Sequence, residues 1–224
     1  MGFEHHVVNG LPPRVVSADT MLATIEELGI VPFFENPIQG YSIEEMTAVE
    51  NWFDTQEDLS FTPWDWKIPC VQSGRIAYGK FLLGGKAAFA TLEWYRELMN
   101  YRRAQPKYVP NEAQRQILAY LNKYGSISIK EVRGLLGIKK GAADSLISSL
   151  MMQCRVVTGD IIRVYRGQDL HYNGWQVSSF CTPEALFGLS DEKGPATDSF
   201  ALLSEHIQGL FPSATPAQIA RLLA

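Results

Sequence analysis

The chain has 224 residues, of which 46% are hydrophobic and 20% are charged, and its formal net charge is -4. This composition is typical of a globular protein and excludes wholesale disorder, a collagen-like chain and a coiled-coil rod. No apolar run approaches the ~20 residues of a membrane helix, and the N-terminus lacks the basic and apolar stretches of a signal peptide. We therefore expect a soluble cytoplasmic protein with no membrane partner.

Cysteine and histidine usage gives no sign of a metal or redox site. Cys70, Cys154 and Cys181 are an odd number, lie far apart and form no CxxC pair, so neither a disulfide framework nor a zinc site is indicated. The adjacent His5 and His6 have no identifiable partner ligands. The chain also lacks a phosphate-binding loop and a dinucleotide fingerprint. We predict three buried free thiols, no metal and no cofactor.

The small net charge conceals a sorting of charge along the chain. Residues 1–66 carry one basic residue, Arg14, against twelve acids, whereas residues 67–166 carry seventeen basic residues against six acids. Residues 167–224 carry two basic residues and six acids. The basic middle third is therefore a candidate surface for a polyanion. The alternative is that the acidic and basic parts face each other within the fold.

The first half of the chain reads as helices around a small hairpin. After an arm without periodicity, Ser17 caps a helix that ends at Gly29, and Ser42 is placed to cap a short helix. An aromatic segment over residues 51–69 follows. Residues 75–83 and 86–91 read as strands joined by a tight Gly-Gly turn, and residues 92–103 read as a helix.

The second half gives the clearer pattern. Asn111 caps a helix ending at Gly125, residues 126–129 form a short strand, and two further helices end at Gly137 and Cys154. Strands over residues 155–158 and 161–165 turn at Gly159-Asp160, a loop surrounds Gly174-Trp175, and helices cover residues 201–210 and 216–222. The order of helix, strand, two helices and hairpin is typical of a winged helix-turn-helix domain.

We predict an α+β, mainly helical fold made of tandem winged-helix-like units with short β-hairpins. The expected parts are a flexible N-terminal arm at 1–16, a winged-helix-like domain with a tryptophan cluster at 17–104, a winged helix-turn-helix domain at 105–182 and C-terminal helices at 183–224. The repeat rests on element order, because the two units share no visible sequence identity.

The second unit carries the candidate DNA-binding residues. The predicted solvent side of its third helix holds Asp144, Ser145, Ser148, Ser149, Met152 and Gln153. That side is poor in residues that read bases, whereas the cations around it are suited to phosphates. The predicted nucleic-acid-binding residues are Lys130, Arg133, Lys139, Lys140, Ser145, Ser148, Arg163 and Arg166. We expect duplex DNA to be bound through its backbone with little sequence preference. The alternative is a structural or protein-interaction module with a solvated basic rim.

The aromatic segment is a second candidate site. Aromatic walls beside a carboxylate can hold a flipped or cationic purine by stacking and charge. The residues of such a pocket would be Trp52, Asp54, Trp64, Asp65, Trp66, Lys67, Arg75 and Tyr78. The structural alternative, which we favour, is that the tryptophans fill the core while Asp65 caps a turn and pairs with Lys67.

The stretch Pro63-Trp64-Asp65-Trp66-Lys67, followed by residues 75–81, resembles the AlkZ-related bacterial proteins. The resemblance continues through Phe89, Trp94, Gly174-Trp175 and the ending Leu210-Phe211-Pro212, so it spans most of the chain. It implies a likeness to AlkZ-type DNA glycosylases, which have tandem winged-helix domains and a glutamine-x-glutamine catalytic motif. Gln114-Arg115-Gln116 has that spelling here but lies inside a predicted helix, so we interpret it as coincidental.

The leading hypothesis is therefore a winged-helix DNA-binding protein related to the AlkZ group, with a role in DNA repair. One alternative is a winged-helix transcriptional regulator or adaptor without enzymatic activity, whose acidic N-terminal region contacts a protein partner. The other is a base-excision enzyme, a DNA glycosylase-like hydrolase, that uses the aromatic and acidic residues of the cluster.

Overall fold

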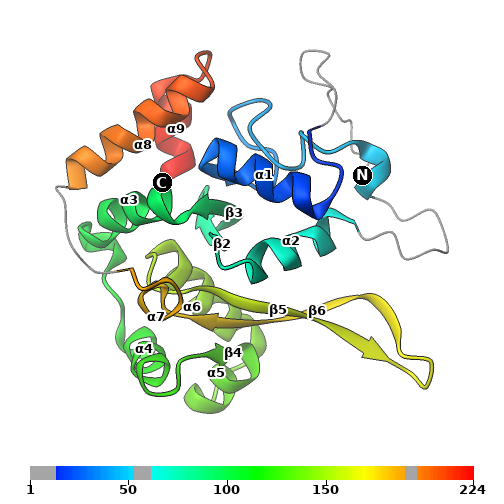
Figure 1. Ribbon diagram of the computed structural model, residues 1–224. Helices are drawn as coiled ribbons and strands as arrows, with labels where there is room; N and C mark the ends of the chain where they lie inside the picture. The colour runs from blue at the N-terminus through cyan, green and yellow to red at the C-terminus, as the bar shows by residue number, and fades with distance from the viewer. Residues whose placement is uncertain (1–13, 53–61, 190–195) are drawn as a thin grey trace.

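The structure is a computed structural model that describes residues 14–52, 62–189 and 196–224 (Figure 1). Most of the predicted N-terminal arm and the middle of the aromatic segment lie outside the described residues. Helices and two small antiparallel sheets alternate along the chain, so the predicted α+β, mainly helical fold is confirmed. We call residues 17–104 the first unit and residues 105–182 the second unit.

The first unit begins with a capped helix and contains a three-stranded sheet. Ser17 forms a capping box with Thr20 at the start of α1, as the sequence predicted. The elements of this unit are α1 (Ala18–Leu28), β1 (Ile30–Pro32), the 3-10 helix η1 (Val49–Trp52), α2 (Pro63–Gln72), β2 (Ile76–Leu82), β3 (Lys86–Thr91) and α3 (Leu92–Arg103).

The second unit has the order of helices that the sequence predicted. Asn111 and Ser128 form capping boxes at α4 and α5, with Gln114 and Glu131 as the reciprocal partners. The elements are the 3-10 helix η2 (Pro106–Tyr108), α4 (Glu112–Tyr124), β4 (Ile127–Ser128), α5 (Ile129–Leu136), α6 (Lys140–Met152), β5 (Val157–Arg166) and β6 (His171–Cys181).

The two units share one strand topology. The sheet of the first unit has the order β1-β3-β2, and the sheet of the second has the order β4-β6-β5. In each, a helix and a short strand come first, and that strand pairs antiparallel with the last strand of the hairpin that follows. This correspondence supports the repeat that element order alone had suggested.

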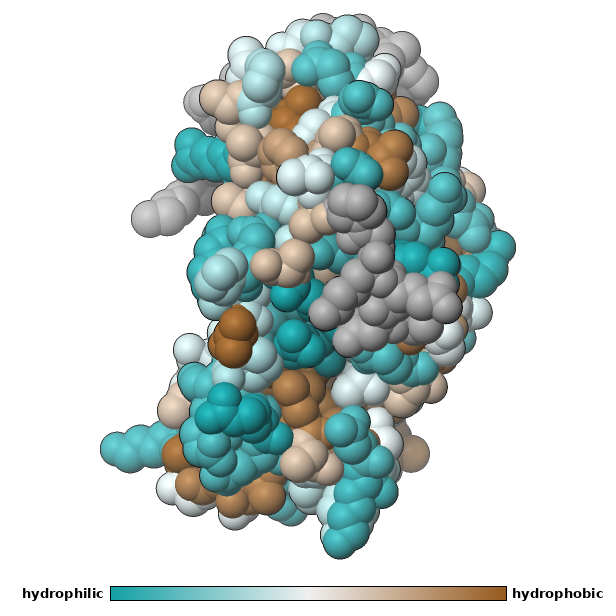
Figure 2. Space-filling view, turned by 90° about the vertical axis from the view of Figure 1, so that its left-hand side faces the viewer, coloured by the Kyte–Doolittle hydropathy of each residue, from teal (hydrophilic) through white to brown (hydrophobic). Residues whose placement is uncertain are grey.

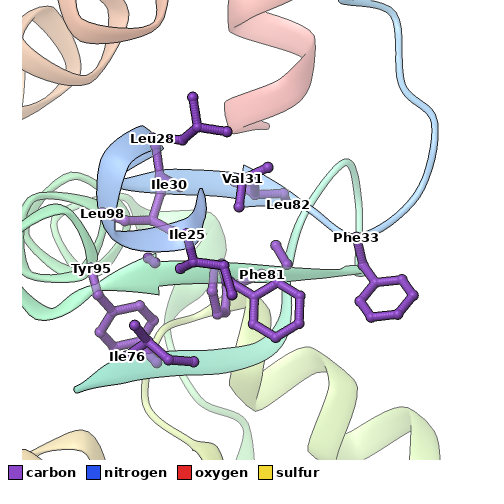
Figure 3. Packing of buried hydrophobic residues seen from close by; sticks show 14 of the residues in the cluster. Ile25, Leu28, Ile30, Val31, Phe33, Ile76, Phe81, Leu82, Tyr95 and Leu98 are labelled. Carbon is purple, nitrogen blue, oxygen red and sulfur yellow. The ribbon is translucent and has the colours of Figure 1, made fainter. Parts of the chain in front are cut away.

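The C-terminal helices pack on the first unit. They are α7 (Pro183–Phe187), α8 (Ala196–Leu210) and α9 (Pro216–Leu223). Leu203 and Ile207 of α8 and Leu222 of α9 are buried in the same core as α1, α3 and the first sheet. Figure 3 shows part of this core, to which Ile25 of α1, Phe81 of β2 and Tyr95 of α3 contribute. The second unit has a core of its own around Ile117, Ile147 and Leu150.

The predicted short helix after Ser42 is wrong, because residues 43–46 form a turn. The Ser42 hydroxyl does accept a hydrogen bond from the backbone N–H of Glu45 at 3.1 Å. However, the backbone N–H of Ile43 donates to the carbonyl of Pro32 at the end of β1. The chain is thereby held against β1 and does not continue as a helix.

The predicted hairpin at Gly159-Asp160 and the loop at Gly174-Trp175 are also wrong. β5 runs through Gly159 to Arg166, and the chain turns at residues 167–170, so Gly174 and Trp175 belong to β6. A Cβ on Gly159 would lie 2.7 Å from Cys181 Sγ on the paired strand. Glycine is required there by close packing between strands, not by a turn. The result is a long hairpin that extends away from the helices (Figure 1).

Candidate nucleic-acid interface

Four of the predicted cations lie on α5 and at the turn that leads from α5 to α6. Lys130 and Arg133 on α5 are exposed, as are Lys139 and Lys140 at the start of α6. We call these four residues the basic turn. Two glycines beside them, Gly137 and Gly141, have open space where a side chain would point. The basic turn therefore combines positive charge with backbone that a large ligand can approach closely.

Two acids of the second unit, Glu131 and Glu112, have local partners, whereas Asp144 on α6 is half-buried and has no hydrogen bond or ion pair among the described residues. Glu131 accepts hydrogen bonds from the Ser128 hydroxyl and backbone N–H, both at 2.7 Å, which lowers the pKa of its carboxyl group. Glu112 pairs with Arg115 at 2.7 Å at the start of α4. Glu131 and Glu112 are held by local partners, and neither pairs with the cations of the basic turn.

The exposed surface of α6 is confined to its first half. Lys140, Gly141, Ala142 and Ser145 are exposed, so Ser145 lies where the sequence placed it. Apart from Lys140, these residues are small, and none of them is an Arg, Asn or Gln that could form two hydrogen bonds to a base edge. A helix presenting them can approach a phosphate backbone but offers few donors or acceptors for base edges.

The second half of α6 is covered, which corrects part of its predicted solvent side. Met151 Sδ accepts a hydrogen bond from the backbone N–H of Lys80 on β2 at 3.4 Å. Ser148 lines a cavity between α6 and β2. Gln153 is buried and donates to Gln114 Oε1 at 3.1 Å. The sequence pattern predicted Ser148 and Gln153 as exposed because it could not show that β2 of the first unit packs on α6.

Two arginines of α3 fix the end of α6. Arg102 is fully buried and donates from Nη1 to the carbonyl of Met152 at 2.6 Å. Arg103 donates from Nη2 to the carbonyl of Cys154 at 2.6 Å. Cations at these positions satisfy carbonyls beyond the last helical hydrogen bonds and oppose the negative end of the helix dipole. The orientation of α6 relative to the first unit is thereby fixed.

The long β5–β6 hairpin carries the other two predicted cations. Arg166 is exposed, and its guanidinium lies 5.4 Å from the ring centroid of Trp175, which is 56% exposed. Arg163 is half-buried and donates from Nε to Asp65 Oδ1 at 3.3 Å. Of the two hairpin arginines, Arg166 is therefore the one placed to contact a ligand.

Figure 2 shows apolar side chains gathered in the lower part of its view, over the second unit.

Asp65 lies in a bridge between α2 and the hairpin. It is 6% exposed, and its Oδ1 accepts hydrogen bonds from the Tyr172 hydroxyl at 2.6 Å, from Arg163 and from Gln176 Nε2 at 3.3 Å. Gln176 also donates to the carbonyl of Trp64 at 3.0 Å. The arrangement suits a carboxylate that holds two distant segments together.

The rings of the predicted base pocket pack against one another. Trp64 is 42% exposed and stacks on the buried Phe33, with ring centroids 5.2 Å apart and planes inclined by 28°. Trp52 meets Trp64 edge to face at 5.9 Å, and Lys67 Nζ lies 5.0 Å from the Trp64 centroid. Burial lowers the pKa of Lys67 to about 8, although neighbouring Asp65 acts in the opposite direction.

The remaining pocket candidates do not join this cluster as one site. Arg75 pairs with Glu26 at 3.0 Å on the surface, and Trp66 packs against the main core. Tyr78 is connected to the cluster through Phe89, whose ring centroid lies 4.8 Å from that of Tyr78 and 5.6 Å from that of Phe33. Asp54 lies outside the described residues. The structure therefore brings Trp52, Trp64, Asp65 and Lys67 into one neighbourhood and places Arg75 in a separate surface contact.

Gln114 has a structural role in α4. Its side chain accepts from the backbone N–H of Asn111 at 2.9 Å and donates to Ser149 Oγ at 2.9 Å. It is 3% exposed, while Arg115 of the same tripeptide pairs with Glu112. These contacts explain the glutamine by helix capping and packing, in agreement with the sequence interpretation.

The predicted state of the cysteines is confirmed, since Cys70, Cys154 and Cys181 are free and buried. Over residues 14–52, 62–189 and 196–224, no group of three or more potential metal ligands comes together. In the same part of the chain, no helix has the length and apolar character to cross a membrane.

Sequence reasoning missed Tyr172 and Gln176 as partners of Asp65, and Trp175 as the partner of Arg166. All three lie on β6, where the sequence analysis had predicted a loop around Gly174-Trp175. The alternation of Trp175 and Val177 with the polar Gln176 and Ser178 was the available strand signal in the sequence.

Two three-stranded antiparallel sheets with the same strand order, set among helices, define a mainly helical α+β protein. Comparison with family models then gives a more specific assignment. Residues 15–224 match the family described as AlkZ related, so this chain belongs to the AlkZ-related family. Searches of curated proteins and of solved structures found no match.

Proposed function

We propose that this protein binds duplex DNA through its sugar-phosphate backbone, with the second unit acting as a winged-helix module. The observation that carries the proposal is the basic turn: four exposed cations lie on α5 and at the start of α6, and the first half of α6 is uncovered. In helix-turn-helix proteins, the first turns of the second helix of the motif approach the DNA groove. Here that region offers charge and small side chains, a combination suited to phosphate contacts.

The hairpin supplies a second contact in this proposal. Arg166 on β5 and the exposed Trp175 on β6 lie next to the hairpin residues that bridge to Asp65. An arginine can neutralise a phosphate, and an exposed indole can pack on a sugar or base. The Asp65 bridge holds the hairpin on α2, so the hairpin would already be in position before DNA binds.

The distribution of charge favours contact through one end of the molecule. Residues 1–66 carry a large excess of acids, whereas the cations proposed to contact DNA lie between residues 130 and 166. The first unit would be repelled by the phosphates that attract the second. Membership of the AlkZ-related family supports a DNA context and a role in DNA repair, because the family name links it to AlkZ-type DNA glycosylases.

The test is fluorescence anisotropy with two labelled duplexes of unrelated sequence at about 50 and 200 mM salt. Release of counterions from four phosphate contacts predicts a loss of affinity of about 100-fold between these concentrations. The two duplexes should bind alike. No binding at 50 mM salt would contradict the proposal and favour the adaptor with a protein partner. Strong preference for one duplex would favour a transcriptional regulator.

Base excision is a second candidate function, favoured by the family match. In the base-excision hypothesis, Asp65 is the carboxylate that stabilises a cationic purine or activates water. The bridge to Arg163 and Tyr172 instead supports a positioning role for Asp65. The variants Asp65→Asn and Tyr172→Phe distinguish a catalytic role of Asp65 from a positioning role, because both weaken the bridge but only Asp65→Asn removes the carboxylate.

The assay is release of alkylated purine from a duplex by the wild-type protein and both variants. A catalytic Asp65 predicts that Asp65→Asn slows excision by about 10²- to 10⁴-fold while Tyr172→Phe changes it little. A parallel loss of rate and melting temperature in both variants would mark Asp65 as a positioning residue. Absence of excision by the wild-type protein across alkylated and crosslinked duplexes would contradict this second candidate.

A further inference from the structure

A cavity of about 150 Å³ lies where α6, β2 and the β5–β6 hairpin meet. From α6 it is lined by Asp144, Ile147, Ser148 and Met151, which follow the i, i+3, i+4, i+7 spacing of one helix face. This face differs from the exposed one proposed to approach DNA. The cavity is therefore a separate feature from the basic turn.

The hairpin provides the opposite wall. Thr158 pairs with Phe180 across the strands, and Ser178 lies two residues before Phe180. Residues directly opposite each other, and residues two apart on one strand, project from the same face of a sheet. One hairpin face thus presents the hydroxyls of Thr158 and Ser178 beside the aromatic ring of Phe180.

Gly79 of β2 forms a third wall of this half-open cavity. A Cβ there would lie 3.2 Å from Phe81 Cδ1 and 3.5 Å from Met151 Sδ. The backbone N–H of the next residue, Lys80, donates to that same sulfur at 3.4 Å. The first unit and α6 are thereby joined at one edge of the cavity, so its walls are held in place by contacts between units.

Two polar groups of the cavity have no partner among the described residues. Asp144 is half-buried and makes no hydrogen bond or ion pair with residues 14–52, 62–189 or 196–224. The hydroxyl of Thr158 likewise has no hydrogen bond in that part of the chain, although Thr158 is only 3% exposed. Neither group is among the fully buried side-chain polar atoms without a partner in the described residues, so both face open space at the cavity and are free to bind a ligand.

The size and lining of the cavity restrict the ligand. A cavity of roughly 150 Å³ holds a ring the size of benzene, and Ile147, Met151 and Phe180 offer apolar contacts to such a ring. A carboxylate is best satisfied by two parallel N–H donors on a cation. The hydroxyls of Ser148, Thr158 and Ser178 can accept or donate further hydrogen bonds.

We propose that this cavity binds a small molecule consisting of one aromatic ring with a cationic, amidine-like pair of N–H donors. The donors would pair with Asp144, and the ring would pack against the apolar side chains of α6 and β6. This site does not depend on DNA binding, because its residues lie on the covered face of α6 and on the hairpin face turned toward β2.

The probe for the test is benzamidine, with benzamide as the neutral analogue of nearly the same shape. Binding is followed by isothermal titration calorimetry and by the methyl resonances of ¹³C-labelled methionines, since Met151 lines the cavity. We expect benzamidine to bind at least about tenfold more tightly than benzamide and to shift the Met151 resonance. Equal affinity for the two compounds, or shifts confined to other methionines, would overturn the proposal.

Two variants locate the site within the cavity. Asp144→Asn keeps the shape but removes the charge, and should weaken benzamidine binding at least about tenfold. Ser148→Leu should block binding by filling the space. The matched control is Asp198→Asn, an exposed carboxylate on α8, which should bind as the wild type does. If the variants retain the wild-type circular dichroism spectrum and bind benzamidine normally, the assignment is wrong.

Discussion

The Tyr172 hydroxyl donates to Asp65 Oδ1 at 2.6 Å although the two residues are 107 positions apart. This hydrogen bond joins β6 to α2, and Gln176 extends the contact by donating to the Trp64 carbonyl. The hairpin is therefore attached to the first unit by a charged network as well as by apolar contacts of Ile161 with the cluster around Ile68 and Val71.

The first prediction measures the strength of this bridge. Tyr172→Phe should lower the free energy of unfolding by about 1–2 kcal/mol, because it removes a hydrogen bond to a charged, buried acceptor. In a double-mutant cycle with Asp65→Asn, urea unfolding should give a coupling energy of at least about 0.5 kcal/mol. The control is Tyr165→Phe, because the half-exposed Tyr165 is the cross-strand neighbour of Tyr172. Additive effects of Tyr172→Phe and Asp65→Asn would show that the bridge contributes nothing.

Local signals allowed much of the helical structure to be predicted. Ser17, Asn111 and Ser128 each precede a helix, and the first two were correctly identified as caps from residue type and position. Capping depends on atoms within three residues, so the sequence carries the necessary information. The exposure of the four cations of the basic turn was predictable in the same way, because the polar side of an amphipathic helix and the turn that follows it are local patterns.

Features set by distant contacts were not predictable from such patterns. Gly159-Asp160 has the composition of a turn, yet Gly159 is needed because Cys181 Sγ approaches it from β6. Gly174 adopts a φ of 82° inside β6, near an irregularity in the strand register. α2 begins at Pro63 and contains Pro69, so it lacks a favourable helical composition and depends on packing against α1 and β5.

The second prediction concerns the pH dependence that buried Lys67 confers. Its pKa is lowered to about 8 in the folded chain from an ordinary value of 10.5. Between these values the unfolded chain binds more protons, so the contribution of Lys67 to stability rises with pH. The cost of burying the charged amine is present in full below pH 8. Cys70 and Cys181, whose pKa values are raised by burial to about 12 and about 11, act in the opposite direction at high pH.

Comparison with Lys67→Met isolates the lysine from the thiols. Urea unfolding at pH 7.5 and 9.5 should show the wild type gaining about 1–2 kcal/mol relative to this variant as pH rises. The exposed Lys86→Met serves as the control and should show no such change. A constant difference between the wild type and Lys67→Met at both pH values would contradict a lowered pKa.

A third prediction tests the close approach of the hairpin strands. Gly159→Ala should lower the free energy of unfolding by about 1–3 kcal/mol, because the new methyl group would overlap Cys181 Sγ. The cost should be smaller in a Cys181→Ala background. Gly134→Ala is the matched control, since Gly134 lies in α5 with open space around it. That change should stabilise the protein by about 0.5–1 kcal/mol. Equal costs of Gly159→Ala in both backgrounds would be inconsistent with the contact.

The most direct test of DNA binding through the basic turn is the salt dependence of a variant with Lys139→Gln and Lys140→Gln together. Losing two phosphate contacts should reduce the slope of log affinity against log salt by about 2 and weaken binding equally on unrelated duplexes. The control, Lys80→Gln with Lys86→Gln, removes two exposed cations from the first unit and should leave the slope unchanged. Fluorescence anisotropy at four salt concentrations measures the affinity and its salt slope for the variant and for the control. An unchanged slope in the Lys139 and Lys140 variant would contradict the proposed interface.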